Sequence, residues 1–289
     1  MTQIIPALSD IGSDYDVLFC DIWGCVHNGR AAYPAAIAAL QQYRQDGGKV
    51  ALVTNAPRPA RFVAQSLDRM GVPRDAWDVI VTSGDAAQDA MFHGAVGRRV
   101  WHLGPDKDDG FFEPETAEEA TADPISRVGL QDAEGIVCTG PFNEMTETPE
   151  DYRDRLTVAR DRGLKLLCAN PDIVVDVGET RIYCAGALAQ FYEQIGGTSL
   201  YYGKPHDPIY DLARRQLGVD RSARALAIGD GIATDILGAA NQGVDALFVT
   251  GGLAASELGD DVENPDNTLM LDWLQRAGHA PRYAIGRLR

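Results

Sequence analysis

Short apolar runs alternate along the chain with segments whose apolar residues recur at helical spacing. The runs are rich in Val, Ile and Leu, which is typical of buried parallel strands, and the alanine-rich segments between them favour helices. This alternation predicts an α/β fold whose main part has five parallel strands. The predicted strands are residues 17–21, 50–54, 79–82, 226–229 and 246–250, and the predicted helices are residues 35–45, 60–70 and 235–242.

The middle of the chain has a complete strand and helix pattern of its own. An insert of this size needs a separate hydrophobic core, because structureless loops of that length are uncommon inside a domain. We therefore predict a core made of residues 1–84 and 198–289, with residues 85–197 inserted as a second α/β domain. The strands predicted in the insert are residues 99–103, 135–139 and 165–169, and the helices are residues 115–122, 150–162 and 185–195.

The composition makes some partners unsuitable. The 289 residues include 26 Lys and Arg against 42 Asp and Glu, a formal net charge of −16 at pH 7. The acidic residues are scattered and no basic stripe interrupts them, so nucleic acid is not expected as a partner. A small phosphorylated ligand bound at one focused site is compatible with this charge, particularly with the help of a metal ion.

Targeting signals and cysteine usage suggest a compartment. Residues 1–16 have neither a basic segment nor an apolar run of signal-peptide length, and no stretch reaches the ~20 apolar residues of a membrane helix. The five cysteines do not form the closely spaced pairs of a zinc site. We expect a cytoplasmic protein with reduced thiols and no membrane partner. Cys20 and Cys25 flank Asp21, where a small buried hydrophobe is favoured over a redox role.

Polar residues stand at the ends of the predicted strands. Ligands of open parallel sheets bind beyond the carboxyl ends of the strands, so these residues are expected to converge on one pocket. Taken singly, each has an ordinary structural explanation in a turn or cap, but their order on successive strand ends favours a shared site. They are Asp21, Thr54, Asn55, Asp230, Asp235 and, between a glycine and a proline, Lys204.

These residue types suit phosphoryl transfer. The carboxylates of Asp21 and Asp230 would repel each other unless a cation lay between them, and hard oxygen ligands suit Mg²⁺. Thr54, Asn55 and Lys204 supply hydrogen-bond donors and a positive charge for a transferring phosphoryl group. A carboxylate such as Asp21 is able to attack phosphorus and form an aspartyl-phosphate.

Four segments carry a family resemblance. "FCDIWG", "LVTNAP", "YYGKPHDP" and "AIGDGIATDILGA" resemble the four motifs of the haloacid dehalogenase (HAD) superfamily of phosphohydrolases. The insert is similar to the α/β cap of the class IIA, or NagD-like, branch, and "VTSGDAA", "ANPD" and "CAGALAQFYEQIGG" strengthen that likeness. The resemblance covers nearly the whole chain. It implies a Rossmann-like core with an inserted cap, and since caps of this branch often take part in dimers, a homodimer.

The resemblance also implies roles for the metal site. Asp21 would be the nucleophile and a Mg²⁺ ligand, with the backbone carbonyl of Trp23 and the carboxylate of Asp230 as further ligands. Asp235 would support the metal or its waters.

Other roles concern the phosphoryl group and the substrate. Thr54, helped by Asn55, would hold the phosphoryl oxygens, and Lys204 would orient Asp21 and offset charge. Asn170 and Asp172 in the cap are the residues we expect to select the substrate.

One position departs from the family pattern. Phosphatases of the family usually have an acid/base aspartate two residues after the nucleophile, and here that residue is Trp23. An indole N–H donates a hydrogen bond but does not exchange protons near neutral pH, and general acid–base help is typically worth ~10² to 10⁴ in rate. His27, or less favourably His206, is a candidate substitute, since histidine titrates near neutrality. The alternative for both is a surface or capping role.

We therefore predict a Mg²⁺-dependent hydrolase of a small phosphate monoester, such as a sugar phosphate or nucleotide, acting through Asp21. One alternative is a dehalogenase-like hydrolase that attacks carbon, because 2-haloacid dehalogenases also have an aromatic residue at the position of Trp23. The other is a catalytically weak protein that binds a phosphorylated ligand.

Overall fold

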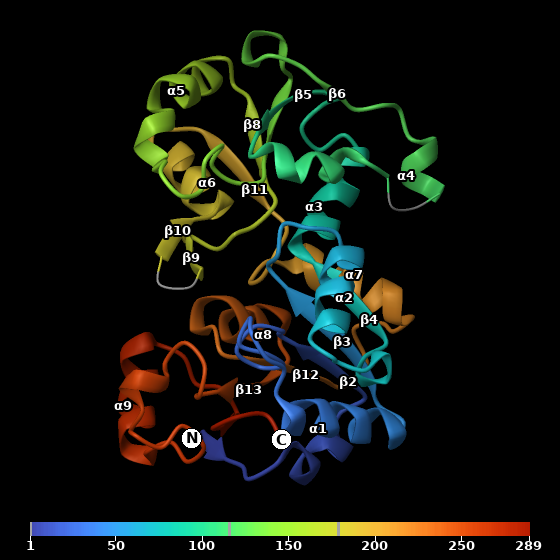
Figure 1. The fold of residues 1–289 in the computed structure, drawn as a ribbon, viewed down its shortest axis with the longest axis vertical. Coiled ribbons are helices and arrows are strands. Elements are labelled where there is room, and N and C mark those ends of the chain that lie inside the picture. The colour runs from blue at the N-terminus through green and yellow to red at the C-terminus, as the bar shows by residue number, and fades with distance from the viewer. Residues whose placement is uncertain (1, 115–116, 178–179) are drawn as a thin grey trace. The chain divides into compact units, whose positions relative to one another are not determined.

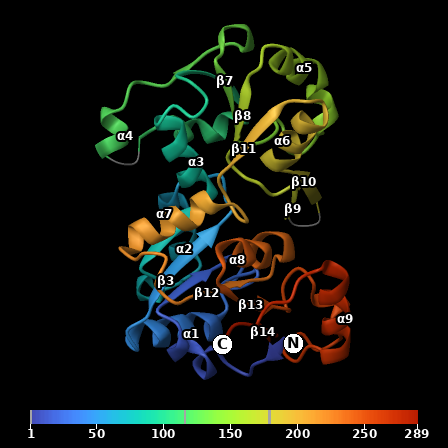
Figure 2. The same cartoon turned by 180° about the vertical axis from the view of Figure 1, so that it is seen from behind.

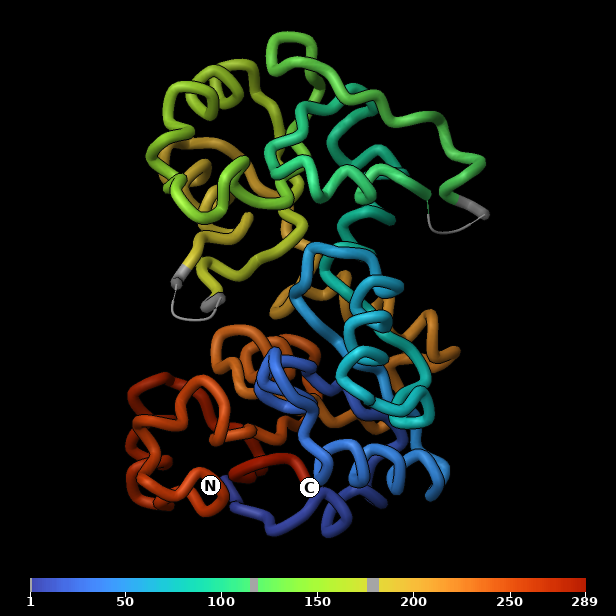
Figure 3. The backbone as a smooth tube through the Cα atoms, in the orientation of Figure 1, coloured from blue at the N-terminus to red at the C-terminus, as the bar shows by residue number. Residues whose placement is uncertain are grey.

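The chain folds into two compact units, which a computed structural model describes for residues 2–114, 117–177 and 180–289. The core unit comprises Met1–Thr54, Arg61–Val81 and Lys204–Arg289, and the insert unit comprises Asn55–Ala60 and Thr82–Gly203 (Figure 1). The chain therefore passes between the units four times, a path that Figure 3 traces by colour. Each unit has its own parallel sheet, so the predicted α/β fold is confirmed.

The core unit is built on a seven-stranded sheet in the order β1-β14-β13-β12-β2-β3-β4. Residues of β2 and β12 are buried throughout, as expected for strands covered on both faces. The five predicted strands are all present, and the prediction missed only the short strands β1 and β14, which pair near the two chain ends (Figure 2). The strands are β1 (Gln3–Ile4), β2 (Val17–Cys20), β3 (Lys49–Thr54), β4 (Val79–Thr82), β12 (Ala225–Gly229), β13 (Asp245–Val249) and β14 (Tyr283–Ile285).

Helices pack against this sheet. Pro34 opens the first of them, where its missing N–H has no cost, and Gly218 ends another in the left-handed conformation at φ 63°. The predicted helix over residues 235–242 is instead a π-helical turn, Ile232–Ile236, that continues into a short α-helix. The α-helices are α1 (Pro34–Gln45), α2 (Ala60–Arg69), α7 (Asp207–Leu217), α8 (Leu237–Gln242) and α9 (Asn267–Ala277).

The insert unit contains a five-stranded sheet in the order β11-β8-β7-β5-β6 and a separate antiparallel pair, β9 with β10. Its core is apolar, with Leu103, Ile136 and Leu166 fully buried. The strands are β5 (Arg99–Leu103), β6 (Ser126–Arg127), β7 (Gly135–Cys138), β8 (Lys165–Cys168), β9 (Val174–Val177), β10 (Thr180–Tyr183) and β11 (Thr198–Tyr201). The α-helices are α3 (Ser83–Phe92), α4 (Ala117–Thr121), α5 (Arg153–Asp161) and α6 (Ala185–Gln194).

The boundaries between the units differ from those predicted. Strand β11 pairs with β8 along its length, so residues 198–203 belong to the insert and not to the core. Asn55–Ala60 also belong to the insert. Helix α3 was missed because it follows β4 without a loop: the Thr82 side chain ends the strand and caps the helix by accepting a hydrogen bond from Asp85 N at 2.8 Å.

Three further predictions are compared with the structure here. Among the described residues, no helix is long and apolar enough to cross a membrane. All five cysteines are buried and unbridged. The predicted helix over residues 115–122 is present as α4, while residues 115 and 116 lie outside the described residues.

Candidate active site

Asp21 follows β2, an inner strand of the core sheet. Its backbone N–H donates to Ile228 O at 2.8 Å, which continues the pairing of β2 with β12 by one residue. The strand order runs from β2 to β3 and β4 on one side and from β12 to β13 and β14 on the other. Asp21 therefore lies at the point where the order reverses, which is where open α/β sheets bind ligands.

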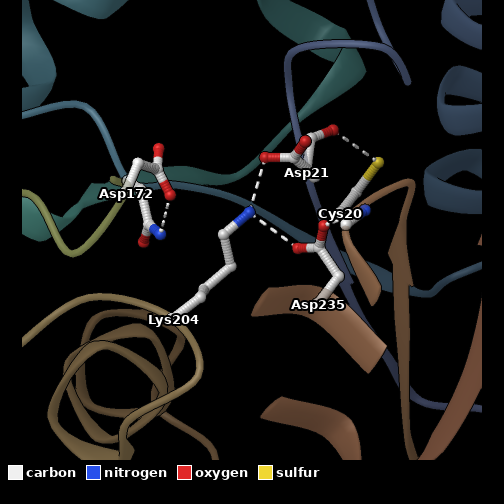
Figure 4. A network of polar contacts seen from close by, with 7 residues as sticks. Cys20, Asp21, Asp172, Lys204 and Asp235 are labelled. Atoms are coloured by element: carbon white, nitrogen blue, oxygen red, sulfur yellow. Dashed lines mark hydrogen bonds and ion pairs between the residues drawn. The ribbon is translucent and has the colours of Figure 1, made fainter. Parts of the chain in front are cut away.

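Lys204 joins two carboxylates of the core unit. Its ammonium Nζ lies 2.6 Å from Asp21 Oδ1 and 2.7 Å from Asp235 Oδ1 (Figure 4). All three side chains are buried, and Lys204 is only 4% exposed. Burial alone would lower the pKa of Lys204, but the charges of Asp21 and Asp235 outweigh it and raise that pKa well above its usual value. Lys204 therefore stays protonated and fixes the orientation of both carboxylates.

Asp235 lies on the π-helical turn after β12. Its Oδ2 accepts a hydrogen bond from Gly231 N at 3.0 Å, while Oδ1 accepts from Lys204. A Cβ on Gly229 would come within 2.0 Å of the Asp235 carboxyl carbon, so only glycine leaves room for this side chain. The turn, of a kind often found at functional sites, thus directs Asp235 back toward the strand end.

Asp230 is held in a cradle of glycines. Its Oδ2 accepts from Leu253 N at 3.0 Å. A Cβ on Gly24 would lie 2.1 Å from that oxygen and one on Gly252 would lie 2.0 Å from it. Gly24 also has φ 80°, a conformation that favours glycine. The backbone therefore approaches the Asp230 carboxylate closely from two loops.

The charges of the site are unbalanced. Asp21, Asp230 and Asp235 against Lys204 give a formal charge of −3 + 1 = −2 when all are ionised. Burial and the neighbouring carboxylates of Asp21 and Asp235 raise the pKa of Asp230 to about 8. Burial likewise raises the pKa of Asp235 to about 6, although Lys204 opposes this shift. A bound cation would relieve the repulsion between the carboxylates, which contributes to these raised pKa values.

The donor set fits a divalent metal ion. Ligand atoms of Asp21, Asp230 and Cys25 all lie within 4.8 Å of one another. The two carboxylates are hard oxygen donors, the type that Mg²⁺ and Ca²⁺ prefer. Burial, and then the charge of Asp230, raises the pKa of the Cys25 thiol well above its usual value, so it remains a protonated and poor ligand. The predicted ligand role of the Trp23 carbonyl stays a prediction.

Cys25 also lies in the site, beside Asp21 and Asp230, and the sequence pattern did not predict this. It was predicted to be a small buried hydrophobe, and it is fully buried. Its position beside the carboxylates follows from the tight loop after Asp21, in which Val26 N donates to Ile22 O at 2.8 Å. Its spacing of four residues from Asp21 was the available signal.

Trp23 and His27 pack against each other in the same loop. Trp23 is 49% exposed, and its ring meets the His27 ring edge-on with centroids 5.4 Å apart. His27 Nδ1 accepts a hydrogen bond from Gly29 N at 2.9 Å, and burial lowers the pKa of His27. These contacts favour a neutral imidazole that shapes the loop. An acid–base role of His27 stays a prediction, and His206 is the N-cap residue of α7.

The remaining predicted residues divide between the units. Thr54 ends β3 in the core unit, next to β2 in the sheet. In the insert unit, Asn55 Nδ2 donates to Asp172 Oδ1 at 2.8 Å (Figure 4), and Asp172 N donates to Asn170 Oδ1 at 2.9 Å. The structure thus brings Asn55, predicted to assist Thr54, into one polar cluster with the two residues predicted to select the substrate.

Comparison with known proteins identifies the family. Residues 18–114 match the pattern of the haloacid dehalogenase-like hydrolases, and residues 201–277 match that of the HAD hydrolase-like proteins. The crystal structure of a haloacid dehalogenase-like hydrolase from Brucella suis 1330 is 40% identical, covers 99% of this chain and 100% of that one, and has a TM-score of 0.81. The chain belongs to the haloacid dehalogenase-like hydrolases. Within them it belongs to the class IIA, NagD-like branch, as its motifs predicted.

More distant relatives are named as a nucleotidase and a phosphatase. A 5'-nucleotidase of Bacillus subtilis is 26% identical over 269 residues, which are 90% of this chain and 98% of that protein. The D-glycerol 3-phosphate phosphatase of Mycobacterium tuberculosis is 26% identical over 258 residues, 85% of this chain and 66% of that protein. A structure of the mycobacterial glycerol phosphate phosphatase in complex with magnesium is 26% identical with a TM-score of 0.66, covering 87% of this chain and 73% of that one. A divalent metal cofactor is therefore supported by a relative as well as by the donor set.

Proposed function

We propose that this hydrolase is a Mg²⁺-dependent phosphatase of a small phosphate monoester, a sugar phosphate or a nucleotide, with Asp21 as its nucleophile. The observation that supports this most directly is the buried Asp21 carboxylate, held by Lys204 at 2.6 Å at the point where the strand order reverses. The names of the relatives, a 5'-nucleotidase and a D-glycerol 3-phosphate phosphatase, agree with this substrate class.

In the proposed reaction, an Asp21 oxygen forms a bond to phosphorus as the bond to the leaving oxygen breaks. Lys204 holds the attacking carboxylate in position and offsets the negative charge. Thr54, helped by Asn55, donates hydrogen bonds to the phosphoryl oxygens. The oxygen of a water molecule then bonds to phosphorus, the bond between phosphorus and Asp21 breaks, and the water proton passes to solvent. Inorganic phosphate and the free Asp21 carboxylate are formed.

Mg²⁺, when bound, would neutralise the charge of the phosphoryl group. Asp21, Asp230 and the carbonyl of Trp23 would hold it, and Asp235 would fix its environment through Lys204 and Gly231. Asn170 and Asp172 are the proposed substrate contacts of the insert unit. The hydrogen bond of Asp172 to Asn55 links them to a residue of the second motif.

A second candidate is a protein that binds a phosphorylated ligand with little turnover. Trp23 favours it, because loss of proton transfer lowers the rate more than the affinity. A third candidate is a hydrolase that attacks carbon, as 2-haloacid dehalogenases do. The activity of such an enzyme would persist in the presence of a chelator.

The test is release of inorganic phosphate from a panel of nucleoside 5'-monophosphates, sugar phosphates and D-glycerol 3-phosphate. We expect activity with Mg²⁺, none with a chelator, and none for Asp21→Asn. The matched control is Asp14→Asn, an exposed aspartate before the amino end of β2, which should behave as wild type. Phosphate-ester binding without release by any substrate would support the second candidate, and chelator-resistant release of halide from 2-haloacids would support the third.

A further inference from the structure

The sheet of the insert unit has its own point at which the strand order reverses. From β5 the order runs to β6 on one side and through β7 and β8 to β11 on the other, and these strands all pair in parallel. The carboxyl ends of β5 and β7 therefore lie side by side at the kind of position where open α/β sheets bind ligands. The segments that follow these two strands are thus placed to form a ligand site within the insert unit.

Thr139, the residue after β7, joins two titratable side chains. Its Oγ1 lies 3.1 Å from Nε2 of His102 in β5, and its hydroxyl donates to the carboxylate of Asp108, which follows β5. Burial, followed by the charge of Arg127, lowers the pKa of His102 to about 4, so the imidazole is neutral near neutral pH. Since the one hydroxyl proton goes to Asp108, the Nε2–H of His102 donates to Thr139. The three groups form a chain of hydrogen bonds that ends at the carboxylate.

An aromatic ring and a glycine fix this chain of hydrogen bonds. The His102 ring meets the Phe112 ring edge-on, with centroids 4.9 Å apart. A Cβ on Gly104 would lie 1.9 Å from Thr139 Oγ1 and 2.6 Å from His102 Nε2, so glycine is required where the backbone passes these polar atoms. The hydroxyl and the imidazole are therefore held in fixed positions.

The Asp108 carboxylate has more acceptor positions than the protein fills. Asp108 is buried, and burial raises its pKa. Within the described residues, its carboxylate accepts one hydrogen bond, from Thr139, and forms no ion pair. A carboxylate has about four acceptor positions, and burial of unfilled ones is costly. A ligand that donates hydrogen bonds would fill them.

The charges around Asp108 favour a neutral donor. Lys107 and Arg58 act on Asp108 through their charges alone, and the charge of Glu144 opposes them. Their formal charges, +2 − 1 = +1, balance the −1 of Asp108. An ammonium would therefore lose its hydration without a net attraction, and an anion would face the Asp108 carboxylate. Hydroxyl groups donate hydrogen bonds without carrying a charge.

We propose that the insert unit binds a sugar by two adjacent hydroxyl groups of its ring, with the Asp108 carboxylate accepting both hydrogen bonds beside Thr139. Two carboxylate oxygens match two neighbouring O–H groups, and in dinucleotide-binding sheets an acidic residue likewise accepts from a ribose hydroxyl. The ligand is a free sugar or the sugar of a nucleoside. The site is built from residues of the insert unit alone and does not rest on the proposed function.

The experiment titrates the whole chain, free of metal, with methyl β-D-ribofuranoside and with its 2-deoxy analogue, which lacks the adjacent pair of hydroxyls. Backbone amide signals in nuclear magnetic resonance spectra report both the affinity and the place of binding. We expect the ribofuranoside to bind ~10-fold or more tightly than the analogue, the value of a hydrogen bond to a charged group. The amide signals of Gly104 and Gly140 should shift, and those of Gly231 and Gly252 in the core unit should not. Adenosine is the third ligand: tighter binding than the ribofuranoside assigns the sugar to a nucleoside, and equal binding assigns a free sugar.

Variants test the two polar groups. Asp108→Asn should weaken binding of the ribofuranoside by ~10-fold or more and remove its advantage over the analogue, because the amide accepts at one atom only. Thr139→Val should also weaken binding, because the carboxylate is no longer oriented, while Thr139→Ser, which keeps the hydroxyl, should bind as wild type. The matched control is Asp154→Asn, at an exposed aspartate of α5. Thermal unfolding verifies the fold of each variant.

Three results would each overturn the inference: equal affinity for the two furanosides, unchanged binding by Asp108→Asn, or signal shifts confined to the core unit. So would the absence of sugar binding, or binding of n-butylamine in its place, which would assign a cation to Asp108. None of these results bears on phosphate release, so failure of this inference would leave the proposed function intact.

Discussion

The ammonium of Lys204 and the carboxylate of Asp21 form a buried ion pair 2.6 Å long between residues 183 positions apart in the chain. The same ammonium binds Asp235, so one cation links the end of β2, the segment before α7 and the turn after β12. Buried pairs of this kind contribute little net stability, but removal of one partner is costly because it leaves a charge uncompensated. Substitution of Lys204 is therefore expected to affect both the stability of the fold and the activity.

Lys204→Met should lower the free energy of unfolding by about 3–5 kcal/mol at pH 8 and abolish phosphatase activity. The loss of stability should be smaller at pH 5, because the pKa of Asp235, about 6 even with Lys204 present, rises further without it. Chemical denaturation at the two pH values measures this. Lys165→Met, at an exposed lysine of β8, is the control. Full stability of Lys204→Met at pH 8 would contradict the prediction.

The double variant Lys204→Met/Asp235→Asn separates structure from chemistry. Neutralising Asp235 removes one of the two uncompensated carboxylates, so part of the lost stability should return. Activity should not return, since Asp21 still lacks its ammonium. Recovery of both would mean that Lys204 acts on the fold alone.

Gly24→Ala should disrupt the metal site. Its Cβ would lie 2.1 Å from Asp230 Oδ2, and its φ of 80° strains any side chain. We expect the Mg²⁺ dissociation constant to rise by ~10-fold or more and activity to fall with it, since one carboxylate ligand is displaced. Isothermal titration with Mg²⁺ measures the first effect. The control is an alanine substitution at another glycine of positive φ, where the added Cβ would contact no other atom.

Gly47→Ala provides that comparison. Gly47 has φ 97°, and a Cβ added there would meet nothing within 4 Å. The substitution should cost about 1–3 kcal/mol of stability from backbone strain, with Mg²⁺ affinity and kcat unchanged. Similar losses of Mg²⁺ affinity in the two variants would show that strain, and not the collision with Asp230, is responsible.

Most strands of the core sheet could be predicted from the sequence. Strands such as β2 and β12 were predictable because they are continuous apolar runs ending in Asp21 and in Gly229-Asp230. The short strands β1 and β14 were not, because two or three residues carry no periodicity and form only by pairing with each other and with β13. The alternation of strands and helices located the site, because it places strand ends at one edge of the sheet.

The contacts within the site could not be predicted from the sequence and were found only in the structure. The hydrogen bond of Asn55 to Asp172 joins residues 117 positions apart, and no local pattern encodes it. The position of Cys25 depends on the turn of a loop that Gly24 permits at φ 80°. Trp23 was recognisable as a departure in the sequence, but its exposure and its support by His27 and Gly29 are tertiary properties.

Mg²⁺ affinity should depend on pH through Asp230. In the metal-free protein the pKa of this carboxyl is raised to about 8, so below pH 8 a proton must leave before the metal binds. The Mg²⁺ dissociation constant should therefore rise as pH falls from 8.5 to 6.5, by up to ~10-fold per pH unit below the pKa. Titrations in buffers of different ionisation enthalpy should detect proton release. Asp230→Asn should bind weakly at every pH, and a pH-independent affinity in wild type would refute the prediction.

His102 should make the insert unit sensitive to acid. Burial, followed by the charge of Arg127, lowers its pKa from 6.5 to about 4, and its Nε2 lies 3.1 Å from Thr139 Oγ1. A group whose pKa is depressed by folding stabilises the protein above its unfolded pKa, and this contribution is lost as pH falls through the folded value. The free energy of unfolding should thus decline between pH 6.5 and pH 4, by at most about 3 kcal/mol from this residue. His102→Gln should flatten that part of the curve, while His279→Gln, in the core unit, should leave it unchanged; equal curves for His102→Gln and wild type would assign the acid sensitivity to other groups.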